Sequence, residues 1–263
     1  MPRYAIISDV HGNLHALRAV LTRIEQLGVD RIICLGDVVG YGPHPAECLR
    51  LIARHAHHFI LGNHEEAVLD PQIANRFNGT AREAIHWTRR NLDPACMSFI
   101  RRFRELEYVG LDRDIICVHD CPVPGPTDYL HDRQMAALAF RGVDAPICLV
   151  GHTHVPAVFG TVEPDPDITL TAPNVILHRP TPQQTVIIEP GMRAICNPGA
   201  VGQPRDSDPR ASFAILERRE SDAAEARYRF TIERVAYDIA AAQAATQAAG
   251  LPTVLSERLA VGA

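Results

Sequence analysis

Acidic, amide and imidazole side chains follow five apolar, strand-like stretches of this sequence, each at the point where the stretch ends. The stretches and the side chains that follow them are 5–8 with Asp9 and His11, 32–36 with Asp37, 59–62 with Asn63 and His64, 115–118 with His119, and 147–151 with His152 and His154. Because strands of an open α/β sheet present their carboxyl ends at one edge, we expect these side chains to meet in a single site. Glycines in several of the turns would let them crowd together.

The residue types indicate the chemistry of that site. Carboxylate, amide and imidazole ligands without thiolates suit Mn(II), Fe(II/III), Zn(II), Co(II) or Ni(II), and Mn(II) is our first expectation. The ligands are too many for one tetrahedral ion. They suit two ions about 3.5–4 Å apart that share a carboxylate, and Asp37, alone in a Gly-flanked turn, is the predicted bridge. Such a pair lowers the pKa of a bound water and supplies hydroxide near neutral pH.

The elements that must position these residues alternate between strands and helices in the first 150 residues. Apolar residues recur at helical spacing from Leu14 to Leu27, and Gly28 suits the position after a helix end. The other predicted helices are 45–55, 78–91, 95–105 and 238–249. The predicted strands are 4–8, 31–35, 58–61, 114–118, 147–150, 185–189, 193–196, 211–216 and 228–235.

This order predicts one layered α/β domain with two sheets over residues 1–250. A stretch rich in Pro and Thr, at about 160–190, reads as a β-rich excursion, either hairpins or irregular chain. Residues 251–263 are expected to form a loose tail. The sequence shows no internal repeat and no domain linker.

Composition excludes several classes of function. The 263 residues are 46% hydrophobic and carry a formal net charge of −5, so nothing favours binding to nucleic acid or to an anionic membrane. No stretch has the apolar length of a membrane span, and the N-terminus has no signal-peptide pattern. The seven cysteines are an odd number, which disfavours a disulfide framework. We expect a cytoplasmic protein, and the oligomeric state stays open.

The ordered motifs Asp9-x-His11, Gly36-Asp37, Gly62-Asn63-His64-Glu65, His119 and Gly151-His152-Thr153-His154 resemble the signature of the calcineurin-like metallophosphoesterases. The later run Asn197-Pro198-Gly199 is similar to the bacterial branch of that family. The resemblance implies a four-layer α-β-β-α sandwich of two mixed sheets flanked by helices. It also implies one metal site made by Asp9, His11, Asp37 and His154, and a second made by Asp37, Asn63, His119 and His152. His64 would lie near the scissile phosphate, where it stabilises charge or protonates the leaving oxygen.

The sequence departs from the protein Ser/Thr phosphatases of this family. Gly40 and Tyr41 stand where those enzymes carry Asp and Arg, and Leu61 replaces the Arg before Gly-Asn-His-Glu. We therefore expect a small phosphodiester or phosphomonoester substrate, with a nucleotide or dinucleoside polyphosphate as one candidate. A protein phosphatase is the alternative enzyme. A non-catalytic scaffold, as in a retromer subunit of the same fold, is disfavoured because every ligand position is filled.

Two further residues complete the predicted site. Asn63 is expected to contact the substrate as well as a metal. Arg205, which follows the Asn-Pro-Gly turn, is either a phosphate contact through its fork of donors or a member of a surface ion pair.

Overall fold

The computed structural model describes residues 2–110, 112–123, 129–162, 171–220 and 226–263. Within these ranges, twelve strands form two mixed sheets of six strands each. The first sheet has the order β3 (His58–Phe59), β2 (Arg31–Cys34), β1 (Arg3–Ile7), β11 (Ala211–Glu220), β12 (Ala226–Val235) and β9 (Thr185–Ile188). The second has the order β4 (Leu106–Val109), β5 (Ile115–Val118), β6 (Ile147–Leu149), β10 (Met192–Asn197), β7 (Ala157–Val162) and β8 (Ile176–His178). Strands β1, β2 and β3 are parallel to one another, as are β5, β6 and β10.

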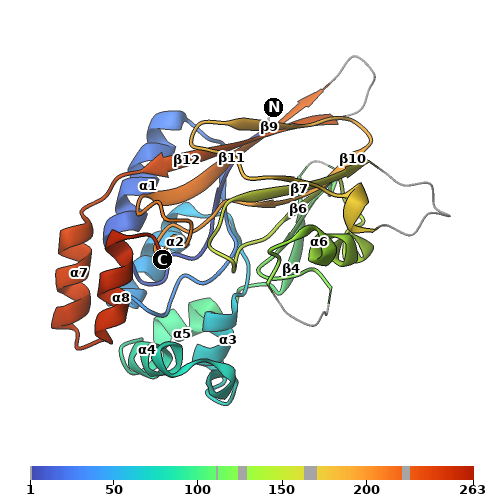
Figure 1. The fold of residues 1–263 in the computed structure, drawn as a ribbon. Helices are drawn as coiled ribbons and strands as arrows, with labels where there is room; N and C mark the ends of the chain where they lie inside the picture. The colour runs from blue at the N-terminus through green and yellow to red at the C-terminus, as the bar shows by residue number, and fades with distance from the viewer. Residues whose placement is uncertain (1, 111, 124–128, 163–170, 221–225) are drawn as a thin grey trace.

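Helices cover the outer faces of the two sheets, which lie face to face (Figure 1). The described α-helices are α1 (Leu14–Leu27), α2 (Pro45–His55), α3 (Asn63–Leu69), α4 (Gly79–Arg90), α5 (Pro94–Ile100), α6 (Arg133–Ala139), α7 (Ile239–Ala248) and α8 (Thr253–Glu257). Helices α1 and α2 pack on the first sheet, and α6 packs on the second. The predicted four-layer sandwich is confirmed.

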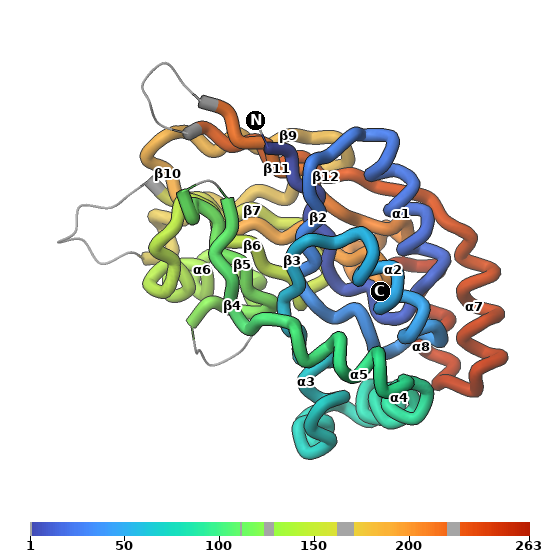
Figure 2. Tube along the Cα trace, turned by 180° about the vertical axis from the view of Figure 1, so that it is seen from behind, coloured from blue at the N-terminus to red at the C-terminus, as the bar shows by residue number. Residues whose placement is uncertain are grey.

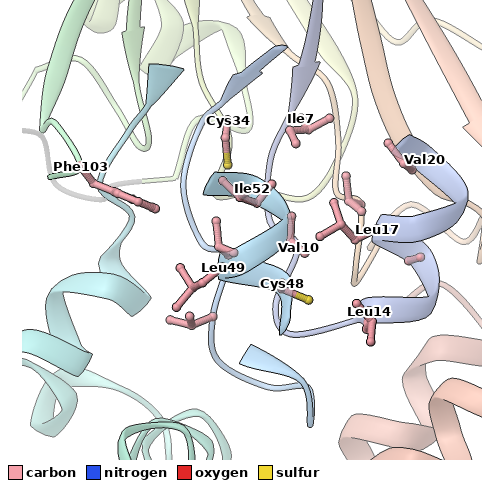
Figure 3. Close-up of a cluster of buried hydrophobic side chains, with 14 of the residues drawn as sticks. Ile7, Val10, Leu14, Leu17, Val20, Cys34, Cys48, Leu49, Ile52 and Phe103 are labelled. Atoms are coloured by element: carbon pink, nitrogen blue, oxygen red, sulfur yellow. The ribbon is translucent and has the colours of Figure 1, made fainter. Parts of the chain in front are cut away.

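Alternation along the strands builds three apolar layers. In β1, Ala5 and Ile7 face α1 and α2, whereas Tyr4 and Ile6 face the second sheet. Figure 3 shows the layer between the first sheet and helices α1 and α2, where Ile7 and Cys34 of the sheet lie near helix residues such as Leu17 and Ile52. Because the two sheets are held by a continuous apolar layer, the ends of their parallel strands keep a fixed relation to one another.

Helix α5 is shorter than the predicted 95–105, since it ends at Ile100. Beyond it, the Arg104 N–H donates to the Phe59 carbonyl, and the Leu61 N–H donates to the Arg104 carbonyl. This pairing with the sheet takes the chain out of helical geometry and leads directly into β4, a strand that we did not predict.

The expectation of a loose tail over 251–263 is wrong. The segment forms α8 and a short 3₁₀ helix at Arg258–Ala260. Leu251, Leu255 and Leu259 recur every four residues, and all three side chains are buried. Helices α7 and α8 lie side by side in both views of the chain (Figure 2). The apolar face explains the order, because it packs these helices against the body of the protein.

The β-rich excursion lies partly outside the described residues, which omit 163–170. Its described parts are β7 and β8, which pair antiparallel at an edge of the second sheet, and β9, which joins an edge of the first. In the described part of the chain, no helix combines the length and apolarity needed to cross a membrane.

Candidate metal centre

The predicted ligands come together where parallel strands of both sheets end. Asp9 and His11 follow β1, Asp37 follows β2, His119 follows β5, and His152 and His154 follow β6. Asn63 and His64 open α3, just beyond β3. Every one of these side chains is buried except that of Asn63, which is half-buried. The side chains meet as the sequence predicted, but they come from the strand ends of two sheets and not from one sheet edge.

One group of potential ligands consists of Asp9, His11 and His154. His154 Nε2 lies 3.2 Å from Asp9 Oδ1 and 3.1 Å from His11 Nε2. His11 Nε2 lies 3.8 Å from Asp9 Oδ1. Two imidazole nitrogens and a carboxylate oxygen thus converge on one small volume, as the ligands of a metal ion would.

A second group consists of Asp37, His119 and His152. Asp37 Oδ2 lies 3.3 Å from His119 Nε2 and 3.7 Å from His11 Nε2, so the same oxygen faces a histidine of each group. Its other oxygen, Oδ1, accepts the His64 backbone N–H at 2.9 Å. This is the arrangement that a carboxylate shared between two ions requires.

Backbone carbonyls fix the orientation of three of the histidines. The Nδ1 atom of His11 lies 3.0 Å from the Val39 carbonyl, that of His119 lies 2.7 Å from the Leu35 carbonyl, and that of His154 lies 2.6 Å from the Gln203 carbonyl. A carbonyl only accepts, so each Nδ1 carries a proton and each Nε2 is the nitrogen left for a metal ion. Metal-binding histidines are typically held by such a hydrogen bond.

Several buried polar atoms in the centre have no hydrogen-bond partner. They include Asp9 Oδ1, Asn63 Oδ1 and His119 Nε2. Buried polar groups are nearly always paired, so an unpaired set calls for an explanation. Divalent transition-metal ions would supply the missing partners, and the donor set of oxygen and imidazole nitrogen fits them. All seven cysteines are free thiols, and none belongs to the two groups.

Burial sets the protonation of this centre. It lowers the pKa of His11 well below its ordinary value and that of His152 to about 3, so both rings are neutral near pH 7. His119 differs: burial alone would lower its pKa, but the adjacent Asp37 carboxylate raises it to about 10. Burial opposes ionisation of Asp37, yet His119 and His64 hold its pKa well below the ordinary value. Asp37 is thus ionised.

Most of the predicted ligands adopt a strained backbone conformation. The residues with positive φ are Asp9 (54°), His11 (49°), Asp37 (51°), His152 (64°) and His154 (60°). The left-handed region costs a non-glycine residue about 1–3 kcal/mol. The surrounding loops impose it through backbone hydrogen bonds, such as that from the Asp9 N–H to the Gly36 carbonyl at 3.0 Å. Such strain is typical of functional sites.

His64 lies beside both groups. Its ring centroid is 4.7 Å from that of His11 and 4.5 Å from that of Tyr41. Its Nδ1 is buried without a hydrogen-bond partner, against the backbone of Gly40. Burial lowers the pKa of His64 to about 4, so the ring is neutral. It also stands within ligand distance of His11 and Asp37, so its role as a non-ligand remains a prediction.

Glu65 is a functional residue that we did not assign from the sequence, although it stands in the Gly-Asn-His-Glu run. Its fully buried carboxylate accepts four backbone N–H groups, from Asp37 (2.7 Å), Val38 (2.8 Å), Val39 (3.0 Å) and Gly62 (3.1 Å). Burial and the Asp37 charge raise its pKa to about 8, while the N–H groups oppose that rise. Glu65 therefore ties the loop of Asp37 to the loop of Asn63.

A cavity of about 280 Å³ opens onto the centre. The predicted site residues that line it are Asp37, Asn63, His64, His152, His154 and Arg205. In the described part of the chain Arg205 forms no ion pair, whereas Asp206 pairs with Arg234. The surface ion pair that we considered for Arg205 thus finds no support. Phe77 and Tyr129 also line the cavity, and we did not single them out because aromatic residues usually pack cores.

Comparison with known proteins gives a consistent result. Residues 2–156 match the family model described as calcineurin-like phosphoesterase. The chain is 32% identical over 260 residues to an uncharacterized protein of Methanocaldococcus jannaschii, covering 98% of this chain and 97% of that protein. A crystal structure of a metallophosphoesterase from Sphaerobacter thermophilus is 41% identical, with a TM-score of 0.80 over 100% of this chain and 99% of that one. A hypothetical protein from Pyrococcus horikoshii, 18% identical with a TM-score of 0.73 over 100% and 99% of the two chains, shares the fold.

Proposed function

Because the chain belongs to the calcineurin-like phosphoesterase family, and so is a metal-dependent phosphoric ester hydrolase, we propose that it hydrolyses a small phosphodiester or phosphomonoester at a centre of two metal ions. The observation that carries this proposal is the position of Asp37 Oδ2, which faces His11 of one ligand group and His119 of the other. One ion alone would leave one of these two groups without a partner.

Asp9, His11 and His154, which lie within ligand distance of one another, would hold the first ion, and Asp37, His119 and His152, which form a second such group, would hold the other. Asp37 would be shared, and the family resemblance adds Asn63 to the second ion. When bound, the ions supply a nucleophilic water of lowered pKa and positive charge for the phosphoryl oxygens. Manganese remains our first expectation for the metal, since oxygen and imidazole donors suit it.

The chain's own residues orient the ester and stabilise its charge. His64 is neutral, and no acceptor holds a proton at Nδ1, so its Nε2–H is free to donate a hydrogen bond to a phosphoryl or leaving oxygen. The half-buried Asn63 faces the same cavity and would contact the substrate beside the second ion. Arg205 adds a guanidinium at the cavity wall.

The size of the cavity favours a small substrate over a protein. About 280 Å³ accommodates a nucleotide-sized ester but encloses little of a folded partner. A protein phosphatase is further disfavoured because Gly40 leaves no carboxylate beside His64. A non-catalytic scaffold would have no need for five strained ligand residues.

The test is hydrolysis of bis(4-nitrophenyl) phosphate and 4-nitrophenyl phosphate by chelator-treated protein, before and after Mn(II) is added. We expect activity only with metal, and a loss of at least ~100-fold in kcat in Asp37→Asn and in His64→Ala. The matched controls are Asp70→Asn and His86→Ala, which change exposed residues of the same types.

Metal content separates the two roles. Asp37→Asn should lower the number of bound ions, whereas His64→Ala should bind two. A folded protein that shows no turnover with any divalent metal would contradict the proposal, as would a single bound ion at full activity.

A further inference from the structure

Arg205 and Arg258 share one neutral acceptor. Arg205 Nη2 and Arg258 Nη1 each donate to Gln203 Oε1, and both distances are 3.2 Å. Neither guanidinium forms an ion pair with a carboxylate of the described residues. Burial and the charge of Arg205 both lower the pKa of Arg258, which marks the pair as electrostatically uncompensated. Two like charges held this close, without an anion, are unfavourable unless a ligand supplies one.

The pair is coupled to the first ligand group. The Gln203 carbonyl accepts from His154 Nδ1 at 2.6 Å, and the Arg205 N–H donates to the His154 carbonyl at 3.3 Å. Gln203 is itself buried. The residue that orients a predicted metal ligand through its backbone therefore anchors both arginines through its side chain.

Arg205 is nevertheless set apart from the reacting position. Tyr41 contacts both His64 and Arg205: its ring centroid is 4.5 Å from the His64 ring and 6.0 Å from the Arg205 Cζ. In the proposed function, the ions and His64 would meet the charge of the reacting phosphoryl group. The Arg205 guanidinium lies beside the Tyr41 ring, which in turn contacts His64, and from there it can meet a different anionic group of the same substrate.

The acidic residues of the cavity lie on the side of the second ligand group. Glu66 and Asp120 line the same cavity, and the pKa of Glu66 is raised by burial and by Asp120, while nearby His119 lowers it. The cavity also holds Arg76, whose side chain is exposed. The cavity thus has Glu66 and Asp120 near the second ligand group and Arg205 beside His154, while Arg258 stands behind Arg205 through Gln203.

From this arrangement we propose that Arg205, backed by Arg258, binds a second anionic group of the substrate. The preferred substrate is then a phosphate ester whose leaving portion carries a further phosphoryl or carboxylate group. This inference rests on the proposed function, since it concerns the specificity of the same centre. Arg205 would contact the anion, and Arg258 would position Arg205 through Gln203 and add charge.

Three esters with the same reacting bond test the proposal in Mn(II)-loaded protein: propane-1,3-diol monophosphate, propane-1,3-diol bisphosphate and 3-phosphooxypropanoate. We expect kcat/KM per reacting phosphate, which halves the value for the symmetric bisphosphate, to exceed that for the monophosphate by ~10-fold, the effect of one charged hydrogen-bonded contact. Comparing the bisphosphate with the carboxylate tells which anion the site prefers. Arg205→Gln and Arg258→Gln should each bring the ratio close to one. Arg219→Gln, at an exposed arginine of β11, is the control and should leave the ratio unchanged.

Arg258→Lys guards against a loss of folding, because it keeps the charge and should retain part of the preference. A ratio near one in the wild type, or a ratio that survives both glutamine substitutions, overturns the second-anion site while aryl ester hydrolysis still supports the phosphoesterase. A drop in melting temperature in Arg258→Gln without a change in the ratio shows a purely structural role and also overturns it. If neither aryl nor alkyl esters are hydrolysed with any divalent metal, the proposed function itself fails.

Discussion

Gly40 lies directly against His64: a Cβ added to Gly40 would stand 2.0 Å from His64 Nδ1 and 2.9 Å from its Cε1. The His64 ring is buried, and the rings of His11, Tyr41 and Phe77 lie 4.7, 4.5 and 5.1 Å from it. Gly40→Ala should therefore displace the imidazole and lower kcat for aryl esters by ~100-fold, close to the effect of removing the ring. Steady-state kinetics of Gly40→Ala, of His64→Ala and of the double variant that carries both changes measure this loss.

The double variant makes the interpretation specific. If Gly40 acts through His64, then Gly40→Ala should cost almost nothing further in a His64→Ala background. Gly40 also has a positive φ of 82°, so alanine strains the backbone in any case. Gly191→Ala controls for that strain, because Gly191 has a φ of 76° and no atom within 4 Å of an added Cβ. Equal losses of activity in Gly40→Ala and Gly191→Ala would rule out the contact.

Glu65 joins two ligand loops, and its replacement by glutamine should uncouple them. Glutamine puts an NH₂ group where a carboxylate oxygen now accepts two backbone N–H groups, so donors would face donors in a buried place. Unsatisfied buried groups cost about 1–3 kcal/mol each, so the free energy of unfolding should fall by about 2–4 kcal/mol. Urea denaturation of the metal-free protein at pH 9, above the pKa of about 8 at which Glu65 ionises, measures this change.

Metal affinity gives Glu65 a second readout. Loss of an outer partner of metal ligands typically costs ~10–100-fold in affinity, and we expect that range in a Mn(II) titration of Glu65→Gln. Glu83→Gln, at an exposed glutamate of α4, should change neither quantity. Unchanged stability and affinity in Glu65→Gln would show that the loops hold their shape without the carboxylate.

Metal binding at neutral pH should release about one proton from His119. In the metal-free protein, burial would lower the pKa of His119, but Asp37 raises it to about 10, so at pH 7 the ring is protonated. A metal ion needs its lone pair, so the proton must leave. Affinity at this site should then rise with pH, roughly tenfold per unit, until the pH reaches that pKa.

Calorimetry in buffers of different ionisation enthalpy measures the released proton. His11 and His152 are neutral already and contribute none at pH 7. The number of protons released on metal binding should fall towards zero in His119→Asn, provided that this variant still binds an ion at the group of Asp9, His11 and His154. A binding enthalpy that does not depend on the buffer in the wild type would contradict this account.

The sequence was sufficient to locate the candidate centre, because the apolar runs predict where the strands end and so which polar side chains follow them. Asp9 follows β1 and His119 follows β5, and in each case a short apolar run ends one or two residues earlier. Parallel strands of one sheet end at the same edge, and the packing of the two sheets brings their two edges together. Periodicity could not reveal β4, since it depends on a tertiary partner: the backbone of Arg104 pairs with that of Phe59. The four-residue spacing of Leu251, Leu255 and Leu259 does indicate an ordered segment, which we did not infer, and Leu255 packs in one cluster with Tyr41 and Ala81.

The sequence also could not show which ligands are held under strain. The residue types of Asp37 and His154 do not tell whether their backbone is in the left-handed or the extended conformation. Backbone bonds from other segments impose the conformation, such as the one from the His11 N–H to the Asp37 carbonyl at 2.9 Å. Nor could it show that Gln203 serves both His154 and Arg205, because a glutamine in a loop is usually solvated.

The strain at His152 should be measurable by comparing two truncations that both remove the ring. His152 has a φ of 64°, where glycine is free and alanine is not, so metal-free His152→Gly should be more stable than His152→Ala by about 1 kcal/mol. The usual order is the reverse, since glycine costs about 0.5–1 kcal/mol relative to alanine. His119 does not have a positive φ, so His119→Ala should be the more stable of its pair. Urea denaturation of the four variants would contradict the strain if alanine were favoured at both positions.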